Sequence, residues 1–300
     1  MRSPVLAVFL AAAALALAGL TARQPSAAPP PTSDSGAPPP APDAGSADTA
    51  AVAAAAEASG SVSGHMSAAK LLIVDVREVI RSPEHWQRRE WEVLTAEVLA
   101  VVGVGVFDES LERDVQRPKS SFADHLAKDF RTFGNYGSFE VLGGFYLGGL
   151  LAHDAKAQAT TLDGLFASGI AGGLIAPFLK LVIGRERPNA HDGAYDFRPF
   201  SLAVSFPSGE STQAFAVASV ISTQYPNPWV EAVSYTTAAI TSWGRIRENG
   251  HWSSDALAGA LIGFHVGRTV VHINQRLRAK VSVAPMVSQT SHGLLLKAGF

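Results

Sequence analysis

Seven apolar segments, most of them longer than a typical strand, follow one another after residue 66 and constrain the fold of this chain more than any other feature. Their hydrophobic residues recur at helical period or form Ala/Gly-rich blocks, and Gly and Pro separate them, as expected between helices. The sequence therefore predicts an all-α helical bundle. The segments are Ala68–Ile80, Trp91–Phe107, Phe139–Leu151, Leu162–Ile183, Thr212–Thr223, Val230–Ser242 and Asp255–Ile273.

The end of the chain follows a different pattern. Val281 and Val283, and later Leu294, Leu296 and Ala298, occupy alternate positions. A period of two is typical of strands. We therefore expect a small C-terminal β-hairpin beside the helices.

Several helical segments are apolar enough to raise the question of a membrane span. Polar or charged residues such as Glu97, Lys180 and Arg268 interrupt them, and most segments fall short of the ~20 residues that a bilayer requires. We therefore expect a soluble or peripherally attached bundle, with a membrane surface left open as a partner.

The first 65 residues divide into two parts. Residues 1–23 combine a positive charge at Arg2, an apolar stretch from Val5 to Leu20 and small residues after it, which is the layout of a secretory signal peptide. An uncleaved anchor helix is the alternative. Residues 24–65 are rich in Pro and Ala and lack large apolar side chains, so we expect a disordered linker. The pattern predicts an exported, periplasmic or envelope-associated protein with one folded domain at residues 66–300.

Composition excludes several classes of function. At 300 residues and 47% hydrophobic content the chain can bury a full core. A formal net charge of -2, without a basic run, argues against a nucleic-acid partner. The absence of cysteine excludes disulfides, zinc sites built on thiolates and cysteine nucleophiles.

The first motif that carries chemistry contains Lys180, Arg187 and Pro188, with Arg185 expected to support it. On a helix from Leu174 to Glu186, the spacing of seven residues would place both cations on one face, and the proline would end the helix. Two solvated basic residues on a surface helix are the alternative. The adjoining apolar block must be largely buried, however, and charges beside buried sequence favour binding of a phosphate-like anion.

The second motif is a loop, Ser205 to Gly209, that leads into a predicted helix. The N–H groups of a helix start attract anions, the Ser208 hydroxyl adds a donor, and Gly209 permits close approach. The same residues occur in ordinary turns and helix starts, so this motif gains meaning only beside the others.

The third motif combines Arg245, His251 and Asp255. Ser253 or Ser254 can cap the following helix, which places His251 just before its first turn. The Asp255 carboxylate would accept the proton of His251 Nδ1 and leave Nε2 free to attack, while Arg245 would hold an oxygen of the attacked group. A lone His-x-x-x-Asp is usually structural, whereas three motifs together favour catalysis.

Together these residues resemble the three-part signature of the type 2 phosphatidic acid phosphatase (PAP2) superfamily, which also includes bacterial acid phosphatases and vanadium haloperoxidases. That signature reads K-x6-RP, PSGH and SR-x5-H-x3-D, and the resemblance covers about residues 139–273. It implies a helical bundle of the PAP2/haloperoxidase type in which His251 forms a phosphohistidine and Asp255 orients it. It also implies a set of residues that bind phosphate oxygens, namely Lys180, Arg187, Ser208, Gly209 and Arg245.

This chain departs from the signature at two positions. Gly244 replaces a serine, and Glu210 stands where the family has the histidine that donates a proton to the leaving group. Glu210 is therefore the candidate acid. A bound phosphate would raise its pKa and the nearby cations would lower it, and the sequence leaves this balance open.

The predicted function is that of an exported phosphohydrolase, acting without a cofactor on a phosphorylated small molecule, as a phosphate monoester, or on a lipid (pyro)phosphate. One alternative is a non-catalytic or attenuated phosphate-binding relative. The other is a vanadium-dependent haloperoxidase, in which vanadate would be a prosthetic group and not an inhibitor.

Overall fold

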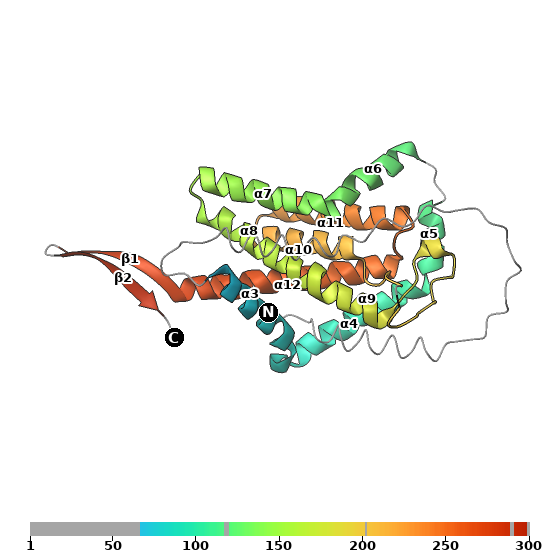
Figure 1. The fold of residues 1–300 in the computed structure, drawn as a ribbon, viewed down its shortest axis with the longest axis horizontal. Coiled ribbons are helices and arrows are strands. Elements are labelled where there is room, and N and C mark those ends of the chain that lie inside the picture. The colour runs from blue at the N-terminus through green and yellow to red at the C-terminus, as the bar shows by residue number, and fades with distance from the viewer. Residues whose placement is uncertain (1–66, 117–119, 202, 289–290, 299–300) are drawn as a thin grey trace, which may run out of the picture.

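The computed structural model describes residues 67–116, 120–201, 203–288 and 291–298, and these form an elongated bundle of helices (Figure 1). The all-α prediction is confirmed. The predicted signal peptide and linker, residues 1–23 and 24–65, lie outside the described residues. The helical elements are α3 (Ala68–Arg81), η2 (Ser82–His85), α4 (Arg88–Val106), α5 (Asp108–Gln116), α6 (Ser121–Arg131), η3 (Thr132–Gly134), α7 (Tyr136–Leu151), α8 (Ala155–Ser168), η4 (Gly169–Ile175), α9 (Ala176–Ile183), η5 (Pro188–Ala190), α10 (Gly209–Gln224), α11 (Pro228–Arg247) and α12 (Ser253–Lys280).

Each predicted segment corresponds to a helix or to part of a longer one. The short helices α5 and α6 were not expected, because their sequences are polar and lack an apolar block. At the C-terminus, β1 (Val281–Ser288) pairs antiparallel with β2 (Ser291–Ala298), so the alternating pattern does form a hairpin.

The run from α8 to α9 is one continuous helical rod with a π-helical segment, η4, in its middle. Pro177 is the second residue of α9, one residue after this segment. A proline lacks the N–H for an i→i−4 bond and its ring crowds the preceding turn, so a local widening of the helix accommodates it. The helical rod therefore continues beyond Pro177, and its last turn places Lys180 at one end of the bundle.

Two helical runs are long and apolar enough to cross a membrane, judged by length and composition. They are Ala155–Ile183, with 29 residues, and Ser253–Arg278, with 26. Both runs are longer than the segments predicted from the sequence, of which only Leu162–Ile183 already exceeded ~20 residues. The Leu162–Ile183 block extends back through α8, and α12 continues past Ile273. About half of each apolar stretch is buried inside the bundle, so the other half faces outward.

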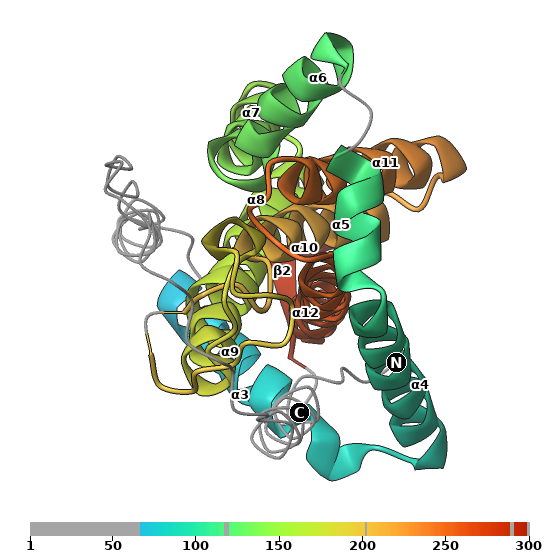
Figure 2. The same cartoon turned by 90° about the vertical axis from the view of Figure 1, so that its right-hand side faces the viewer.

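Helix α12 lies at the centre of the bundle, with α3, α4, α8 and α10 packed around it (Figure 2). Its closest neighbour is α10, and glycines at four-residue spacing on α12 let the two backbones approach. At Gly263 an added Cβ would lie 2.3 Å from the Thr212 carbonyl oxygen. This approach fixes the start of α10 against the start of α12.

We predict that Gly263→Ala destabilises the fold by about 1 to 3 kcal/mol, because backbone atoms of α10 cannot yield to the new methyl group. Gly144→Ala on α7 is the matched control, since nothing lies within 4 Å of its added Cβ. Alanine there should be neutral or stabilising, by up to about 1 kcal/mol. Thermal unfolding of both variants in detergent measures the difference. Equal melting temperatures would show that the two helices do not need this close approach.

Candidate active site

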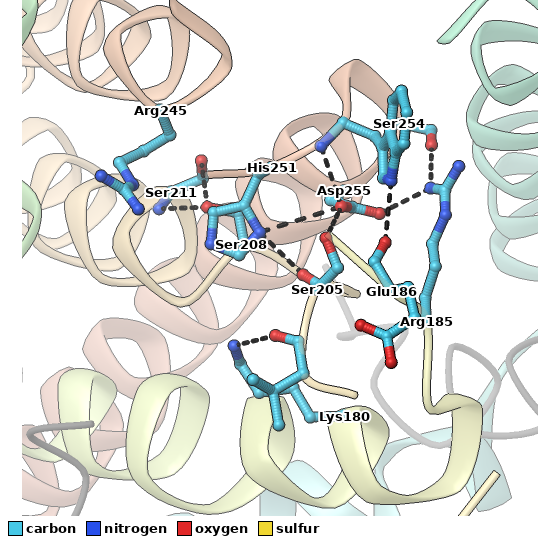
Figure 3. Close-up of polar contacts among 12 residues, drawn as sticks. Lys180, Arg185, Glu186, Ser205, Ser208, Ser211, Arg245, His251, Ser254 and Asp255 are labelled. Atoms are coloured by element: carbon cyan, nitrogen blue, oxygen red, sulfur yellow. Dashed lines mark hydrogen bonds and ion pairs between the residues drawn. The ribbon is translucent and has the colours of Figure 1, made fainter. Parts of the chain in front are cut away.

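The predicted site residues gather at one end of the bundle, where α9 and α11 end and α10 and α12 begin. Figure 3 shows His251 with Arg245 on one side and Asp255 and Arg185 on the other. The structure therefore brings parts of all three motifs together, from segments that are far apart in the sequence.

His251 is fully buried and its imidazole is fixed in orientation. Its Nδ1 lies 2.8 Å from the Ser205 carbonyl oxygen, a distance at which Nδ1–H donates to that oxygen. Nε2 then points the other way, toward Glu210, whose Oε2 lies 3.3 Å away. The expected hydrogen bond from Nδ1 to Asp255 is not formed, since Asp255 Oδ2 lies 3.8 Å from it. The backbone carbonyl, which has no sequence signal, is the closer acceptor.

Asp255 instead holds the surroundings of the histidine in place. Its Oδ2 accepts a hydrogen bond from the Ser205 hydroxyl at 2.6 Å and another from the backbone N–H of Trp252 at 3.0 Å. Ser205 thus contacts both Asp255 and His251, one through its hydroxyl and one through its carbonyl. Sequence reasoning placed Ser205 only in the loop before α10. Nothing in the sequence distinguishes a serine at this position from an ordinary turn residue.

Arg185 is the buried cation behind Asp255. Its guanidinium contacts Asp255 at 2.6 Å and Asp108 at 2.8 Å, and it donates to the Ser254 hydroxyl at 2.7 Å. The Ala194 carbonyl accepts two further bonds from it. The sequence identified Arg185 as a supporting residue, and the structure shows what it supports.

Asp108, at the start of α5, is a residue that sequence reasoning missed. It is fully buried, its Oδ1 accepts the Ser254 backbone N–H at 2.9 Å, and its Oδ2 contacts Arg185 and the Ser254 hydroxyl. Asp108 belongs to no recognisable motif, and its partners are more than 70 residues away in the sequence. No local pattern could have indicated this role.

The helix expected to carry both Lys180 and Arg187 ends earlier than predicted. Gly184 adopts a φ of 58° and closes α9, and an added Cβ there would lie 1.9 Å from the Arg198 carbonyl oxygen. Lys180 lies in the last turn of α9, and its Nζ donates to the Val204 carbonyl at 2.6 Å. Arg187 comes after the helix, in extended conformation. The argument from helical spacing is therefore wrong for this pair, because a left-handed glycine separates them.

Ser208 and Gly209 form the start of α10, as expected. Ser208 is the N-cap, and its Oγ accepts hydrogen bonds from the backbone N–H and the hydroxyl of Ser211. The nearest atom to an added Cβ at Gly209 is Lys180 Cε, at 4.0 Å. The positive end of a helix dipole and an ammonium group thus lie side by side, as an anion requires.

Arg245 and Glu210 form an ion pair in the same place. Arg245 is buried near the end of α11; its Nε lies 3.2 Å from Glu210 Oε1 and its Nη1 lies 2.5 Å from Glu248 Oε2. Burial by itself raises the pKa of Glu210, but the hydrogen bond and charge of His251, together with Arg245, outweigh burial and hold that pKa well below its usual range. Glu210 is therefore ionised in this arrangement.

Two of the predicted phosphate-binding arginines keep a buried nitrogen without a hydrogen bond. Arg187 Nε has no hydrogen-bond partner among the described residues, and Arg245 Nε makes only the 3.2 Å ion-pair contact with Glu210 Oε1, without hydrogen-bond geometry. An unsatisfied guanidinium N–H is costly when buried, and an oxyanion would satisfy it. We call Lys180, Ser208, Gly209, Arg245 and His251 the anion site, with Arg187 expected to join them when an anion binds.

Across the described ranges, no three histidine, aspartate or glutamate side chains are grouped so that they could hold a metal ion. The groups that the structure does bring together are a buried imidazole, a helix N-terminus and several cations. This combination suits attack on a phosphorus atom whose oxygens are held by positive charge.

Sequence comparisons relate the part of the chain that carries the three motifs to known proteins. Residues 162–279 match the model of the PAP2 superfamily. A lipid A 1-phosphatase from Porphyromonas gingivalis is 42% identical over 90 residues, which are 29% of this chain and 18% of that protein. One from Rhizobium etli is 36% identical over 119 residues, or 36% of this chain and 50% of that protein. The chain thus spans at most half the length of these curated relatives.

Two solved structures are also similar. The crystal structure of Aquifex aeolicus LpxE aligns with a TM-score of 0.43 at 22% identity, over 55% of this chain and 95% of that one. The crystal structure of the first transmembrane PAP2 type phosphatidylglycerolphosphate phosphatase from Bacillus subtilis aligns with a TM-score of 0.46 at 15% identity, over 61% and 96%.

We predict that Asp108→Asn destabilises the protein by about 3 kcal/mol or more. An asparagine has one oxygen where aspartate has two, so its amide group would face either Arg185 or the Ser254 N–H as a second donor. Asp192→Asn is the matched control, because Asp192 also pairs with an arginine, Arg198, but at the surface. Its effect should stay within about 0.5 kcal/mol. Denaturant unfolding compares the two, and equal losses would contradict the prediction.

Proposed function

We propose, from the premise that the chain belongs to the PAP2 superfamily, that it is an exported, membrane-associated phosphatase of lipid phosphates. The observation that carries this proposal is the orientation of His251. Its Nδ1 is held by the Ser205 carbonyl, so that Nε2 faces Arg245 and Glu210 at the start of α10.

The reaction would proceed by double displacement. The substrate's phosphate oxygens bind to the anion site, and His251 Nε2 attacks phosphorus while the bond to the leaving oxygen breaks. The Ser205 carbonyl and the nearby Asp255 carboxylate stabilise the positive charge that develops on the imidazole. A water molecule then attacks the phosphohistidine, which releases inorganic phosphate and restores the free Nε2.

Glu210 is our candidate for the group that gives a proton to the leaving oxygen. Its carboxylate lies beside Nε2, whereas the leaving oxygen departs on the opposite side of phosphorus, so the Glu210 side chain would have to rotate to reach that oxygen. It is also ionised in the structure. It would therefore have to take up a proton as the negatively charged substrate binds. The proton shared with His251 Nε2 could supply it, and this transfer would also leave Nε2 with the lone pair that attacks phosphorus. The same carboxylate could then accept a proton from the attacking water in the second step.

Three observations support a lipid substrate. The matched curated relatives are lipid A 1-phosphatases. Two helical runs are long and apolar enough to cross a bilayer. Finally, exposed apolar side chains lie around Lys180. Phe178 and Leu181, which are 46% and 48% exposed, are its near neighbours in the chain, and Phe200, which is 74% exposed, is joined to Leu181 by a hydrogen bond from its N–H to the Leu181 carbonyl. We propose that these side chains face the lipid portion of the substrate while its phosphate reaches the anion site.

A second candidate function is phosphate binding without turnover. The ion pairs of Glu210 favour it, because an ionised carboxylate cannot donate a proton and it contacts the nitrogen that must attack. The two candidates differ in one observable, the phosphoenzyme.

We predict that the parent protein forms a phosphoenzyme, labile to acid and stable to base, and that His251→Ala forms none and has no turnover. Sulfate should still bind to the variant, because Lys180 and Arg245 remain. His191→Ala is the matched control, since this exposed histidine lies outside the anion site. Labelled phosphate from a lipid or alkyl phosphate, trapped by rapid quenching, gives the readout. Undiminished turnover by His251→Ala would refute the mechanism, and a parent that binds phosphate without a phosphoenzyme would favour the second candidate.

We also predict that Phe200→Asn lowers activity on a lipid phosphate in mixed micelles several-fold and leaves hydrolysis of nitrophenyl phosphate unchanged. Phe200 has a φ of 60°, which asparagine tolerates, so the backbone should be preserved. Trp229→Asn is the control. Trp229 is 80% exposed and lies at the start of α11, ~24 Å of helix away from Arg245. Equal losses on both substrates would argue against a lipid-facing role for Phe200.

A further inference from the structure

The carboxylate of Glu210 contacts two groups that the substrate phosphate also needs. Its Oε1 lies 3.2 Å from Arg245 Nε and its Oε2 lies 3.3 Å from His251 Nε2. A nitrogen that faces a carboxylate oxygen at this distance has no room for a phosphorus atom on the same side. The resting arrangement and the substrate complex therefore exclude each other.

We infer that Glu210 is an internal anion, which occupies part of the anion site and has to be displaced by the phosphoryl group of the substrate. This inference rests on the proposed function, because the site in question is the one assigned there to the phosphate.

The backbone of Glu210 cannot move out of the way, so displacement must be a rotation of its side chain. Glu210 is the second residue of α10, and an added Cβ on Gly134 would lie 2.7 Å from Glu210 Cβ and 3.0 Å from its carbonyl oxygen. This packing fixes the backbone. The side chain, by contrast, is 24% exposed, which leaves the carboxylate a path toward solvent.

The charges around Glu210 suit an exchange of one anion for another. Arg245 keeps Glu248 as a second partner at 2.5 Å, so it stays paired while Glu210 leaves. Arg131 faces Glu248 at 3.8 Å, Lys180 lies beside Gly209, and Asp255 lies behind His251. A phosphate would replace the ion pairs that Glu210 gives up, and a carboxylate moved into water regains its hydration.

A matched pair of variants tests the inference. Glu210→Gln removes the charge that contacts His251, whereas Glu248→Gln removes a charge that also contacts Arg245 but not His251. The two side chains are equally exposed, at 24%. Sulfate is the probe, because it remains a dianion across the usable pH range and cannot be hydrolysed. Its affinity for the full chain in detergent would be measured by calorimetry at one pH and ionic strength.

We expect Glu210→Gln to bind sulfate on the order of tenfold more tightly than the parent, with a clearly smaller gain in Glu248→Gln. Unchanged or weaker binding in Glu210→Gln, with its melting temperature preserved, would overturn the inference. Equal gains in both variants would also overturn it, because they would reflect only the loss of negative charge near Arg245.

A structure of the parent with sulfate bound covers the case in which Glu210→Gln does not fold. The Glu210 carboxylate should then have left His251 Nε2, and its persistence there beside a bound sulfate would refute displacement. The outcome is separable from that of the proposed function. If Glu210→Gln binds sulfate more tightly but the parent forms no phosphoenzyme, the inference about Glu210 stands and the proposed catalytic function fails. If the parent forms a phosphoenzyme but Glu210→Gln binds sulfate as the parent does, the proposed function stands and the inference fails.

Discussion

The arrangement of this site depends on one buried cation, Arg185, and the two buried carboxylates around it. A guanidinium is costly to remove from water unless its donors are satisfied, and here Asp255, Asp108, the Ser254 hydroxyl and the Ala194 carbonyl take them up. Because these partners come from α5, from the loop after α9 and from the first turn of α12, the ion cluster fixes three segments at once. His251 lies just before that first turn, so the ion cluster also fixes the position of His251.

The close packing of α10 on α12 adds the second constraint. Where Gly263 meets the α10 backbone, no side chain separates the helices, so the start of α10 cannot shift along α12. The backbone N–H of Ser208 donates to the Asp255 carbonyl at 3.0 Å, which joins the two helix starts directly. The dipole of α10 and the imidazole of His251 are thus held by the same contacts. Asp108 is part of this arrangement although it lies outside the residues that match the family model.

The sequence predicted the helical class, most of the helices and the residues that meet at the site, because these depend on local period and on motifs with fixed spacing. It could not predict contacts made by the backbone or by distant residues. The hydrogen bond from His251 Nδ1, expected to go to Asp255, goes to the Ser205 carbonyl. Asp108, which contacts Ser254, belongs to no motif that could have indicated this contact. The left-handed Gly184 ended a helix that the apolar pattern alone would have continued. Two apolar runs also extend beyond the predicted segments, and each contains a fully buried polar residue that is paired inside the bundle: Asn274 of α12 donates to Asp163 of α8 at 2.9 Å.

A glutamate at position 210 changes the electrostatics of a site whose other charged groups are arranged for an anion. A histidine there would be neutral or positive and would add to the attraction for phosphate, whereas an ionised glutamate opposes it. The same negative charge is stabilised by His251 and Arg245, so the empty site is more stable than a cluster of unpaired cations would be. The binding free energy of a substrate must then offset the free energy lost with these ion pairs before any chemistry occurs. Under the proposed function, a lipid would meet this requirement better than inorganic phosphate, because burial of its apolar portion against exposed side chains such as Phe200 would add a favourable free energy that does not depend on the anion site. A glutamate that weakens the binding of bare phosphate would then favour substrates that carry apolar surface.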